Sequence, residues 1–188
     1  MSDIHLVGLS GSLRKNSSNT LLMNEAARLF APARFTQGDM NLPLLNEDLN
    51  EGDGPEAAQR LAEVIRSADA VIISTPEYNK MIPGVVKNAL DWLSILKGGN
   101  PMVDKPVAIM SAAAGRAGGE RSQYTLRHAL VPHRTRVVLA PEVMIPGANN
   151  AFDEEGRLKD PKSVEFLGRL MDALKAEMAL MARETAPA

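Results

Sequence analysis

The sequence predicts an α/β fold in which one open parallel sheet of five strands carries helices on both faces. Short apolar runs alternate five times with segments of helical pattern, as in chains that build a parallel sheet from strand–helix units. Two of the runs, 4–9 and 68–75, are almost continuously apolar, which is typical of strands buried on both faces. The length of 188 residues fits one domain. We therefore expect residues 1–188 to form a single doubly wound unit with the strand order 2-1-3-4-5.

The expected strands are apolar segments bounded by loop-forming residues. The first leads into a polar loop at Ser10, and the third ends at Pro76, which cannot donate a hydrogen bond within a sheet. The second alternates only weakly between apolar and polar side chains. The strands are predicted at 4–9, 33–40, 68–75, 106–111 and 136–139, the last with a continuation at 142–145 as an alternative.

The expected helices have apolar residues three and four positions apart. Pro32 stops the first helix, and Pro83 lies near the start of the third, where proline is favoured. The last helix carries a stripe of Val, Leu and Met side chains from Val164 to Met181, which we interpret as core packing. The helices are predicted at 20–31, 55–67, 83–96, 121–131 and 161–182.

The composition argues against several classes of function. The chain has no cysteine, which rules out disulfides, thiolate metal sites and cysteine catalysis. The formal net charge of -2, with both signs spread along the chain, gives no indication of a nucleic-acid or membrane partner. No apolar run approaches the roughly 18 residues of a membrane span, and no signal peptide is evident. We therefore expect a cytoplasmic protein without membrane insertion.

The loop after the first strand is the first candidate for ligand binding. Residues 10–20 combine small residues, hydroxyls, amides and the cation of Arg14. Because the loop leads from a strand into a helix, it offers free backbone N–H groups and a positive helix end to an anion such as phosphate. The G-x-G-x-x-G and G-K-[ST] phosphate motifs are absent. The alternative is a polar linker in which Ser18 or Asn19 only caps the helix.

If this loop binds a phosphate, the loops after strands 3 and 4 should complete the site, because ligands of such sheets bind at the carboxyl ends of strands where the winding reverses. Residues 75–84 contain two prolines, Tyr78 and Asn79, and so offer an apolar face and hydrogen bonds to a flat heterocycle. Residues 111–120 are rich in Gly and Ala, which lets a planar ring approach backbone N–H groups. The alternatives are an ordinary turn and a flexible connection.

These three loops carry the resemblance of the chain to a known family. The motifs are residues 11–15 with Ser17 and Asn19, residues 76–79, residues 82–92, Ser111 with Gly115 and Gly118-Gly119, and Gln123 with Leu126-Arg127. With them the chain resembles the NADPH-dependent FMN reductase family, which comprises flavodoxin-like quinone, chromate and azo-dye reductases. The motifs span residues 11–127, and the order of strands and helices extends the match over nearly the whole chain.

The resemblance implies an FMN site at the strand ends. The FMN phosphate contacts that it implies are Ser12, Arg14, Ser17 and Asn19. The ring contacts are Pro76, Glu77, Tyr78 and Asn79, with Ser111 and Gly115 at the other edge of the isoalloxazine. The chain departs from the pattern at Met81, where a small polar residue is usual. That departure puts in doubt any hydrogen bond from this position.

The function that we expect is an FMN-dependent oxidoreductase that takes electrons from NADPH or NADH and passes them to quinones, azo compounds, chromate or ferric chelates. No catalytic side chain and no metal are predicted, because the flavin supplies the redox chemistry and the three histidines are far apart in sequence. Glu77 is expected in a structural salt bridge or subunit contact, with a proton relay as the alternative. Arg116 either contacts a nicotinamide-nucleotide phosphate or is solvated.

Two other classes of function stay open at this point. A flavodoxin-type electron carrier would serve a protein partner, and such carriers are usually strongly acidic, unlike this chain. A flavin-dependent or flavin-free regulatory domain is the other alternative, since a fold does not determine a function. The resemblance further implies a homodimer or homotetramer. The physiological acceptor and the choice between NADH and NADPH are not indicated by the sequence.

Overall fold

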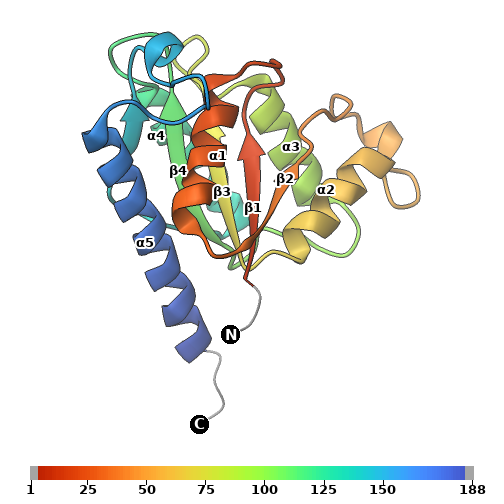
Figure 1. Ribbon diagram of the computed structural model, residues 1–188. Helices are drawn as coiled ribbons and strands as arrows, with labels where there is room; N and C mark the ends of the chain where they lie inside the picture. The colour runs from red at the N-terminus through yellow and green to blue at the C-terminus, as the bar shows by residue number, and fades with distance from the viewer. Residues whose placement is uncertain (1–3, 185–188) are drawn as a thin grey trace.

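The computed structural model describes residues 4–184, and these form one twisted parallel sheet between two layers of helices (Figure 1). The strand order is β2-β1-β3-β4-β5, with β6 also paired to β4. This is the predicted order 2-1-3-4-5. The strands are β1 His5–Ser10, β2 Arg34–Gly38, β3 Ala70–Thr75, β4 Pro106–Ala112, β5 Arg136–Val137 and β6 Val143–Ile145.

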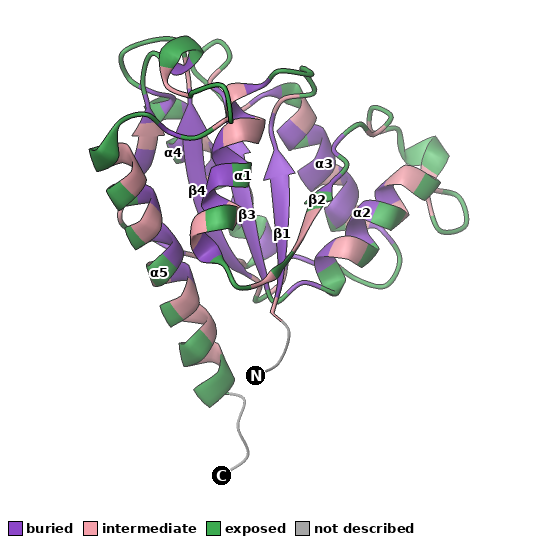
Figure 2. Cartoon of the chain, viewed as in Figure 1, coloured by how far each residue is buried: buried purple, intermediate pink, exposed green. Residues whose placement is uncertain are grey.

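The helices divide between the two faces of the sheet. Helices α1 and α5 pack on the face with Leu6 and Ile72, whereas α2, α3 and α4 pack on the face with Val7 and Val71. Successive strand residues point to opposite faces, and the three central strands β1, β3 and β4 are therefore buried on both sides, whereas the edge strand β2 is largely exposed or half-buried (Figure 2). The helices are α1 Ser18–Phe30, α2 Glu56–Arg66, α3 Gly84–Ile95, α4 Glu120–Leu130 and α5 Pro161–Glu184.

The register brings the carboxyl ends of the strands level with one another. Leu9 pairs with Gly38 on β2, Ser10 with Ser74 on β3, and Thr75 of β3 with Ser111 on β4. Because all these pairs are parallel, the loops that leave β1, β2, β3 and β4 emerge at one edge of the sheet, at the top of Figure 1.

The fifth strand is shorter than the prediction of 136–139 and is interrupted. β5 ends at Val137, although the backbone N–H of Val138 still donates to the carbonyl of Val107 at 2.8 Å. Pairing with β4 resumes in β6, where Val143 lies opposite Met110. The segment between them contains Pro141, whose missing N–H cannot contribute to a strand ladder. The continuation expected at 142–145 is therefore present as β6, after the short β5.

The long loop after β2 is held by the helix that follows β3. Asn88 of α3 donates to the carbonyl of Pro43 at 2.9 Å and accepts from the backbone N–H of Leu45 at 2.7 Å. The indole N–H of Trp92, one helical turn later, donates to the same Pro43 carbonyl at 2.8 Å. A short 3₁₀ helix, η1 Glu47–Asn50, follows in the same loop. The Asn-x-x-x-Trp pattern therefore fixes this loop through hydrogen bonds, in addition to the packing of Leu42 and Leu45 against the core.

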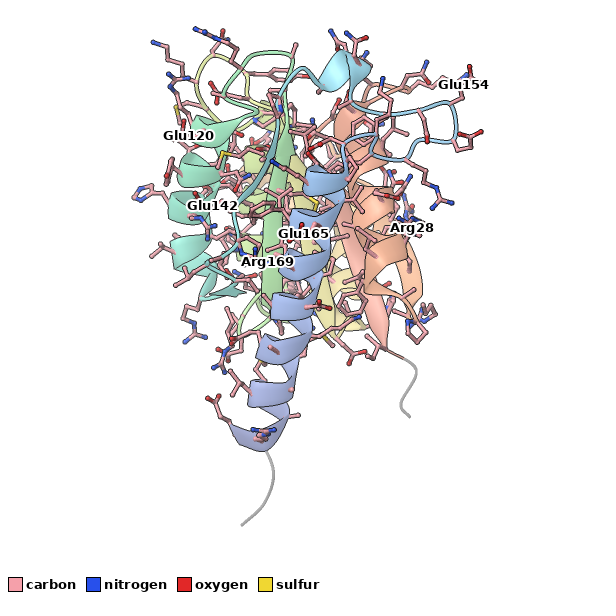
Figure 3. The ribbon with its side chains drawn as sticks, turned by 60° about the vertical axis from the view of Figure 1, so that its left-hand side comes forward. Arg28, Glu120, Glu142, Glu154, Glu165 and Arg169 are labelled. Atoms are coloured by element: carbon pink, nitrogen blue, oxygen red, sulfur yellow. The ribbon has the colours of Figure 1, made fainter. Side chains whose placement is uncertain are left out.

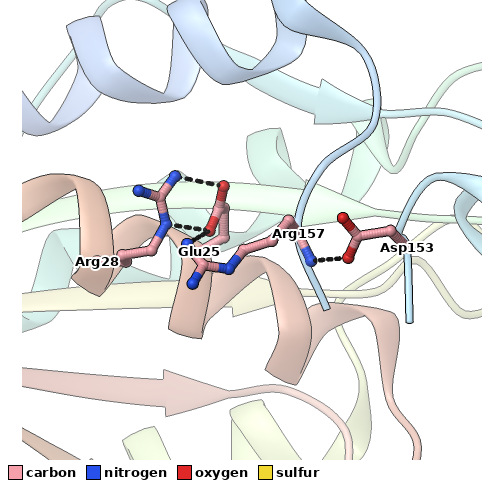
Figure 4. A network of polar contacts seen from close by, with 4 residues as sticks. All are labelled: Glu25, Arg28, Asp153 and Arg157. Atoms are coloured by element: carbon pink, nitrogen blue, oxygen red, sulfur yellow. Dashed lines mark hydrogen bonds and ion pairs between the residues drawn. The ribbon is translucent and has the colours of Figure 1, made fainter. Parts of the chain in front are cut away.

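The segment between β6 and α5 is anchored on α1. The buried carboxylate of Glu25 accepts two hydrogen bonds from Arg28, at 2.7 and 2.8 Å, and lies 4.0 Å from the guanidinium of Arg157 (Figure 4). Asp153 accepts the backbone N–H of Arg157 at 2.7 Å and closes the turn. In Figure 3, the turn carrying Glu154 projects away from α5 toward the α1 side. These contacts fix a segment that reaches the strand ends.

Within residues 4–184, no helix is both long enough and apolar enough to cross a membrane.

Candidate functional site

A cavity of about 310 Å³ lies at the carboxyl ends of β1, β3 and β4. This volume is at the lower end of the range of about 300–1,000 Å³ for small-molecule sites. Seven of the ten residues predicted for the site line the cavity: Ser12, Arg14, Ser17, Asn19, Pro76, Glu77 and Tyr78. Asn79, Ser111 and Gly115 do not line it. The three loops singled out in the sequence therefore meet at one place.

The loop between β1 and α1 presents its polar groups as an anion site requires. Ser17 is the N-cap of α1, and its hydroxyl accepts the backbone N–H of Asn19 at 3.2 Å. The cap is thus Ser17, and not Ser18 or Asn19 as in the linker alternative. Among residues 4–184, neither the exposed guanidinium of Arg14 nor the backbone N–H of Ser17 has a hydrogen-bond partner. A cation and a helix N-terminus are therefore free to receive an anion.

The side chain of Asn19 ties the strand ends together. Its amide nitrogen donates to the carbonyl of Ala112 at 2.8 Å, and its oxygen accepts the backbone N–H of Ala112 and the hydroxyl of Ser74, both at 3.0 Å. Asn19 is 3% exposed. Although it borders the cavity, its side-chain oxygen is engaged by β3 and β4. Its implied phosphate contact stays a prediction, whereas its support of the loop is a property of the fold.

The loop after β3 forms a tight two-residue hairpin. Tyr78 and Met81 exchange backbone hydrogen bonds of 3.1 and 3.0 Å. The two residues between them, Asn79 and Lys80, have φ values of 51° and 67°, the left-handed conformation of a type I′ turn. Asn tolerates this conformation well. The turn leaves the side chains of Tyr78 and Met81 more than half exposed beside the cavity.

Glu77 is held in place by the first turn of α4. One carboxylate oxygen accepts the backbone N–H of Arg121 at 3.1 Å, and the other lies 3.3 Å from the guanidinium of Arg121. The N–H groups of a first helical turn have no partner within the helix, so a carboxylate there is favoured by hydrogen bonding and by the helix dipole. The expected structural salt bridge of Glu77 is therefore present, and it joins the β3 loop to α4.

The loop after β4 offers small side chains to the cavity, but Ser111 points away from it. The hydroxyl of Ser111 donates to the carbonyl of Gly118 at 2.7 Å and accepts from the amide of Gln123 at 2.9 Å. Ser111 is fully buried against α4, and Ala112, Ala113 and Ala114 line the cavity instead. Of the predicted segment 111–115, the three alanines therefore line the cavity, and its role as the ring edge stays a prediction. Gly115 is exposed, with open space where a Cβ would be.

Three residues that sequence reasoning missed also line the cavity: Ser18, Ala148 and Asn149. The hydroxyl of Ser18 donates to the carbonyl of Ala148 at 3.2 Å, and the backbone N–H of Ala148 donates to Ala113 at 3.1 Å. The segment after β6 therefore contributes a fourth wall. The signal available in the sequence was that β6 is itself a strand of the same parallel sheet, so that its following loop also emerges at this edge.

The histidines take no part in the cavity. The ring of His5 contacts the carbonyl of Ser67 and the hydroxyl of Thr36, and His128 is exposed. His133 is buried and contacts the amide of Asn100 at 2.8 Å, and burial lowers the pKa of its ring. In the part of the chain that the structure describes, no group of His, Asp or Glu residues could hold a metal ion.

The comparison with known proteins agrees with this geometry. The sequence model of the NADPH-dependent FMN reductase family matches residues 4–150. The chain belongs to this family. An NAD(P)H-dependent FMN reductase from Pseudomonas aeruginosa is 44% identical to this chain over 175 residues, which cover 92% of the chain and 94% of the relative. A quinone reductase from Escherichia coli is 38% identical over 170 residues, or 87% of the chain and 89% of the relative.

A solved structure gives the same result in three dimensions. The flavoenzyme NAD(P)H:(acceptor) oxidoreductase FerB from Paracoccus denitrificans is 33% identical to this chain and superposes on it with a TM-score of 0.86. The superposition covers 94% of the chain and 98% of FerB. Family membership makes the protein an oxidoreductase of the flavodoxin-like fold that uses FMN and NAD(P)H. The expected family, fold and cofactors are therefore confirmed.

The donor set of the cavity fits FMN. A phosphate needs cations, hydroxyls and free N–H groups, and the β1 loop provides Arg14, Ser12 and the backbone of Ser17. A flat ring needs apolar walls with few protruding side chains, and these are available in Pro76 and the alanines at 112–114. A polar end and a flat apolar end thus lie in one cavity, as in the cofactor itself.

Proposed function

We propose that the cavity binds FMN and that the protein passes electrons from NADPH or NADH to quinones or similar small acceptors. The observation that carries this proposal is the meeting of the β1, β3 and β4 loops in one cavity, with the exposed guanidinium of Arg14 on the β1 side and small apolar walls on the β4 side. The match of the family sequence model to residues 4–150 supports it independently. On this proposal, residues 1–188 form a single FMN-binding domain.

The β1 loop would hold the phosphate of FMN. Arg14 supplies a guanidinium cation, and Ser12 and Ser17 supply hydroxyl groups. A charge-assisted hydrogen bond of this kind contributes about 1.5–3 kcal/mol. Asn19 would act mainly on the loop itself, because its side-chain oxygen already accepts two hydrogen bonds.

The β3 and β4 loops would hold the isoalloxazine ring. When bound, FMN supplies the redox chemistry, since its ring accepts two electrons from a nicotinamide and passes them to an acceptor. The chain positions the ring through Pro76 and Tyr78 and keeps the β3 loop fixed through the Glu77–Arg121 pair. Tyr78 lines the cavity and is more than half exposed, so substrates would reach the ring from that side.

The charges around the cavity favour an enzyme over an electron carrier. Five exposed cations lie on the three loops or at the start of α4: Arg14, Lys15, Lys80, Arg116 and Arg121. The neighbouring acids are Glu77, which is paired with Arg121, and Glu120. A basic rim attracts the anionic phosphates of a nicotinamide nucleotide, whereas carriers of the flavodoxin type are usually acidic. The rim therefore also supports the interpretation of Arg116 as a co-substrate contact.

The electron acceptor is inferred from the names of the relatives. Relatives named as quinone reductases, among them the Escherichia coli protein, make quinones the first choice. Azo compounds, chromate and ferric chelates are further candidates because an open flavin site suits all of them. A cytoplasmic location and a homodimeric or homotetrameric assembly remain predictions from the resemblance and the sequence.

The test is anaerobic stopped-flow spectroscopy of the FMN-loaded protein. NADH or NADPH should abolish the absorbance of the oxidised flavin, and a quinone added afterwards should restore it. If neither nucleotide abolishes this absorbance, the proposed enzyme activity is refuted. The result would then favour an electron carrier or a regulatory domain. If the flavin-free protein is incubated with excess FMN and is still colourless after the unbound FMN has been removed, the cofactor site is refuted as well. Steady-state rates with a panel of acceptors then rank quinone, azo compound, chromate and ferric chelate.

A further inference from the structure

A second cavity lies on the opposite side of the β1 loop. It has a volume of about 650 Å³ and is bounded by the β1 loop and by the segment that follows β2. Ser12 and Arg14 line both this cavity and the proposed FMN cavity. The two cavities are thus neighbours at the proposed phosphate site, and the function proposed above uses only the smaller one.

The side chains around the second cavity match the parts of an adenine nucleotide. Lys15 provides a second cation next to Arg14, and within residues 4–184 its ammonium group has no hydrogen-bond or ion-pair partner. Leu13, which is 57% exposed, offers an apolar surface that suits a purine ring, and Met40, although buried in the core, also borders the cavity. The amides of Gln37 and Asn41 lie on the same wall.

An acidic residue lies where a ribose would be recognised. Asp39 directly follows β2, and the register places it next to the end of β1, since Gly38 pairs with Leu9. One of its carboxylate oxygens accepts the backbone N–H of Asn41 at 2.9 Å. In folds that bind dinucleotides across a strand–helix–strand unit, an acid at the end of the second strand accepts ribose hydroxyls. Asp39 occupies the corresponding position beside the β1 loop.

We propose that this second cavity binds the AMP half of FAD, so that the protein accepts FAD as well as FMN. The inference rests on the proposed FMN site, because FAD is FMN extended by AMP at its phosphate. Arg14 would lie between the two phosphates, and Lys15 would compensate the charge of the added one. Asp39 would accept from the ribose, and Leu13 and Met40 would contact the adenine.

The two residues that the cavities share favour FAD over the nicotinamide nucleotide as the occupant. The AMP half of FAD begins at the phosphate, and the cavities meet at Ser12 and Arg14, the residues proposed to bind that phosphate. NADH and NADPH must instead place their nicotinamide against the flavin ring, which lies toward the β3 and β4 loops. An adenosine in the second cavity would then require the nucleotide to pass over the FMN phosphate, with like charges side by side.

The experiment is calorimetric titration of the flavin-free protein with FMN and with FAD. We expect FAD to bind within about tenfold of the affinity of FMN. Lys15→Ala should weaken FAD by about tenfold and FMN by less than twofold, because the ammonium group faces only the added phosphate. Asp39→Asn keeps an acceptor for the N–H of Asn41 and removes the charge, so it should weaken FAD alone, by about fivefold. Lys162→Ala, at an exposed lysine of α5, is the matched control and should change neither affinity.

Each other outcome decides between the two proposals. A protein that binds FMN but binds FAD more than about a hundredfold more weakly refutes the FAD inference and leaves the proposed function intact. Equal losses for FMN and FAD in Lys15→Ala also refute it, because the lysine would then belong to the FMN phosphate site. A rise in the KM for NADH of FMN-loaded Lys15→Ala, with FAD affinity unchanged, assigns the cavity to the co-substrate. If the protein binds neither FMN nor FAD, both the proposed function and the FAD inference are refuted.

Discussion

Replacement of Asn19 by Ala is the most informative perturbation of the fold around the site. The side chain makes three buried hydrogen bonds, two with Ala112 and one with Ser74. A typical intramolecular hydrogen bond contributes about 0.5–1.5 kcal/mol to stability, so the loss of three gives roughly 1.5–4.5 kcal/mol. The upper half of this range is expected, because the backbone N–H and C=O of Ala112 would stay buried without their partner.

The assay is equilibrium urea unfolding of the flavin-free protein, followed by circular dichroism. Asn19→Ala should move the unfolding midpoint to lower urea without a large change in the slope. Asn16→Ala is the matched control, because Asn16 lies in the same loop and is exposed, and it should cost less than about 0.5 kcal/mol. A loss below about 1 kcal/mol for Asn19→Ala would show that the strand ends are held by other contacts.

Three further predictions concern the phosphate site, the β3 turn and a buried histidine. Arg14→Ala should weaken FMN binding by about tenfold to a hundredfold, because one charge-assisted hydrogen bond is lost, as measured by calorimetric titration. Lys80→Gly should raise the free energy of unfolding by about 1 kcal/mol, because φ is 67° at this position and a side chain is disfavoured there. Burial lowers the pKa of His133 from 6.5, so the unfolded chain binds the proton first as the pH falls below 6.5. Wild-type stability should therefore decrease from pH 7 to pH 5, and His133→Gln should reduce this pH dependence.

These predictions have separate controls. For Arg14→Ala the control is Lys162→Ala, which removes a distant exposed cation. If Lys162→Ala weakens FMN binding as much as Arg14→Ala does, Arg14 acts only through the net charge of the protein. Asn79→Gly tests the neighbouring position of the same turn, where Asn already tolerates φ of 51°, so a gain as large as that of Lys80→Gly would contradict the strain argument. An unchanged pH profile in His133→Gln would show that other groups cause the acid sensitivity.

The fold and the meeting of three loops could be predicted from the sequence for a physical reason. Parallel strands joined by helices place all their carboxyl ends at one edge of the sheet, so the loops after β1, β3 and β4 had to lie near one another. The Pro, Gly and Ser residues that mark these loops are visible without a structure. The position of the cavity at these strand ends therefore follows from the topology of the sheet.

The orientation of single side chains was harder to predict. Ser111 was expected at the ring edge, but it faces α4, while its neighbour Ala112 faces the cavity. Strand alternation contains this information, because Val107 and Ile109 pack with α2–α4 and Ser111 has the same parity. Asn149 could not be found in this way, since its place depends on contacts such as Ser18 with Ala148, which are 130 residues apart in sequence.

The measurement that tests the account most directly is a crystal structure of the protein with FMN bound. We predict that the FMN phosphate contacts Ser12, Arg14 and Ser17, and that the ring lies between Pro76–Tyr78 of the β3 loop and the alanines at 112–114. FMN bound at another surface, or turned so that its phosphate lies toward the β3 loop, would contradict the account.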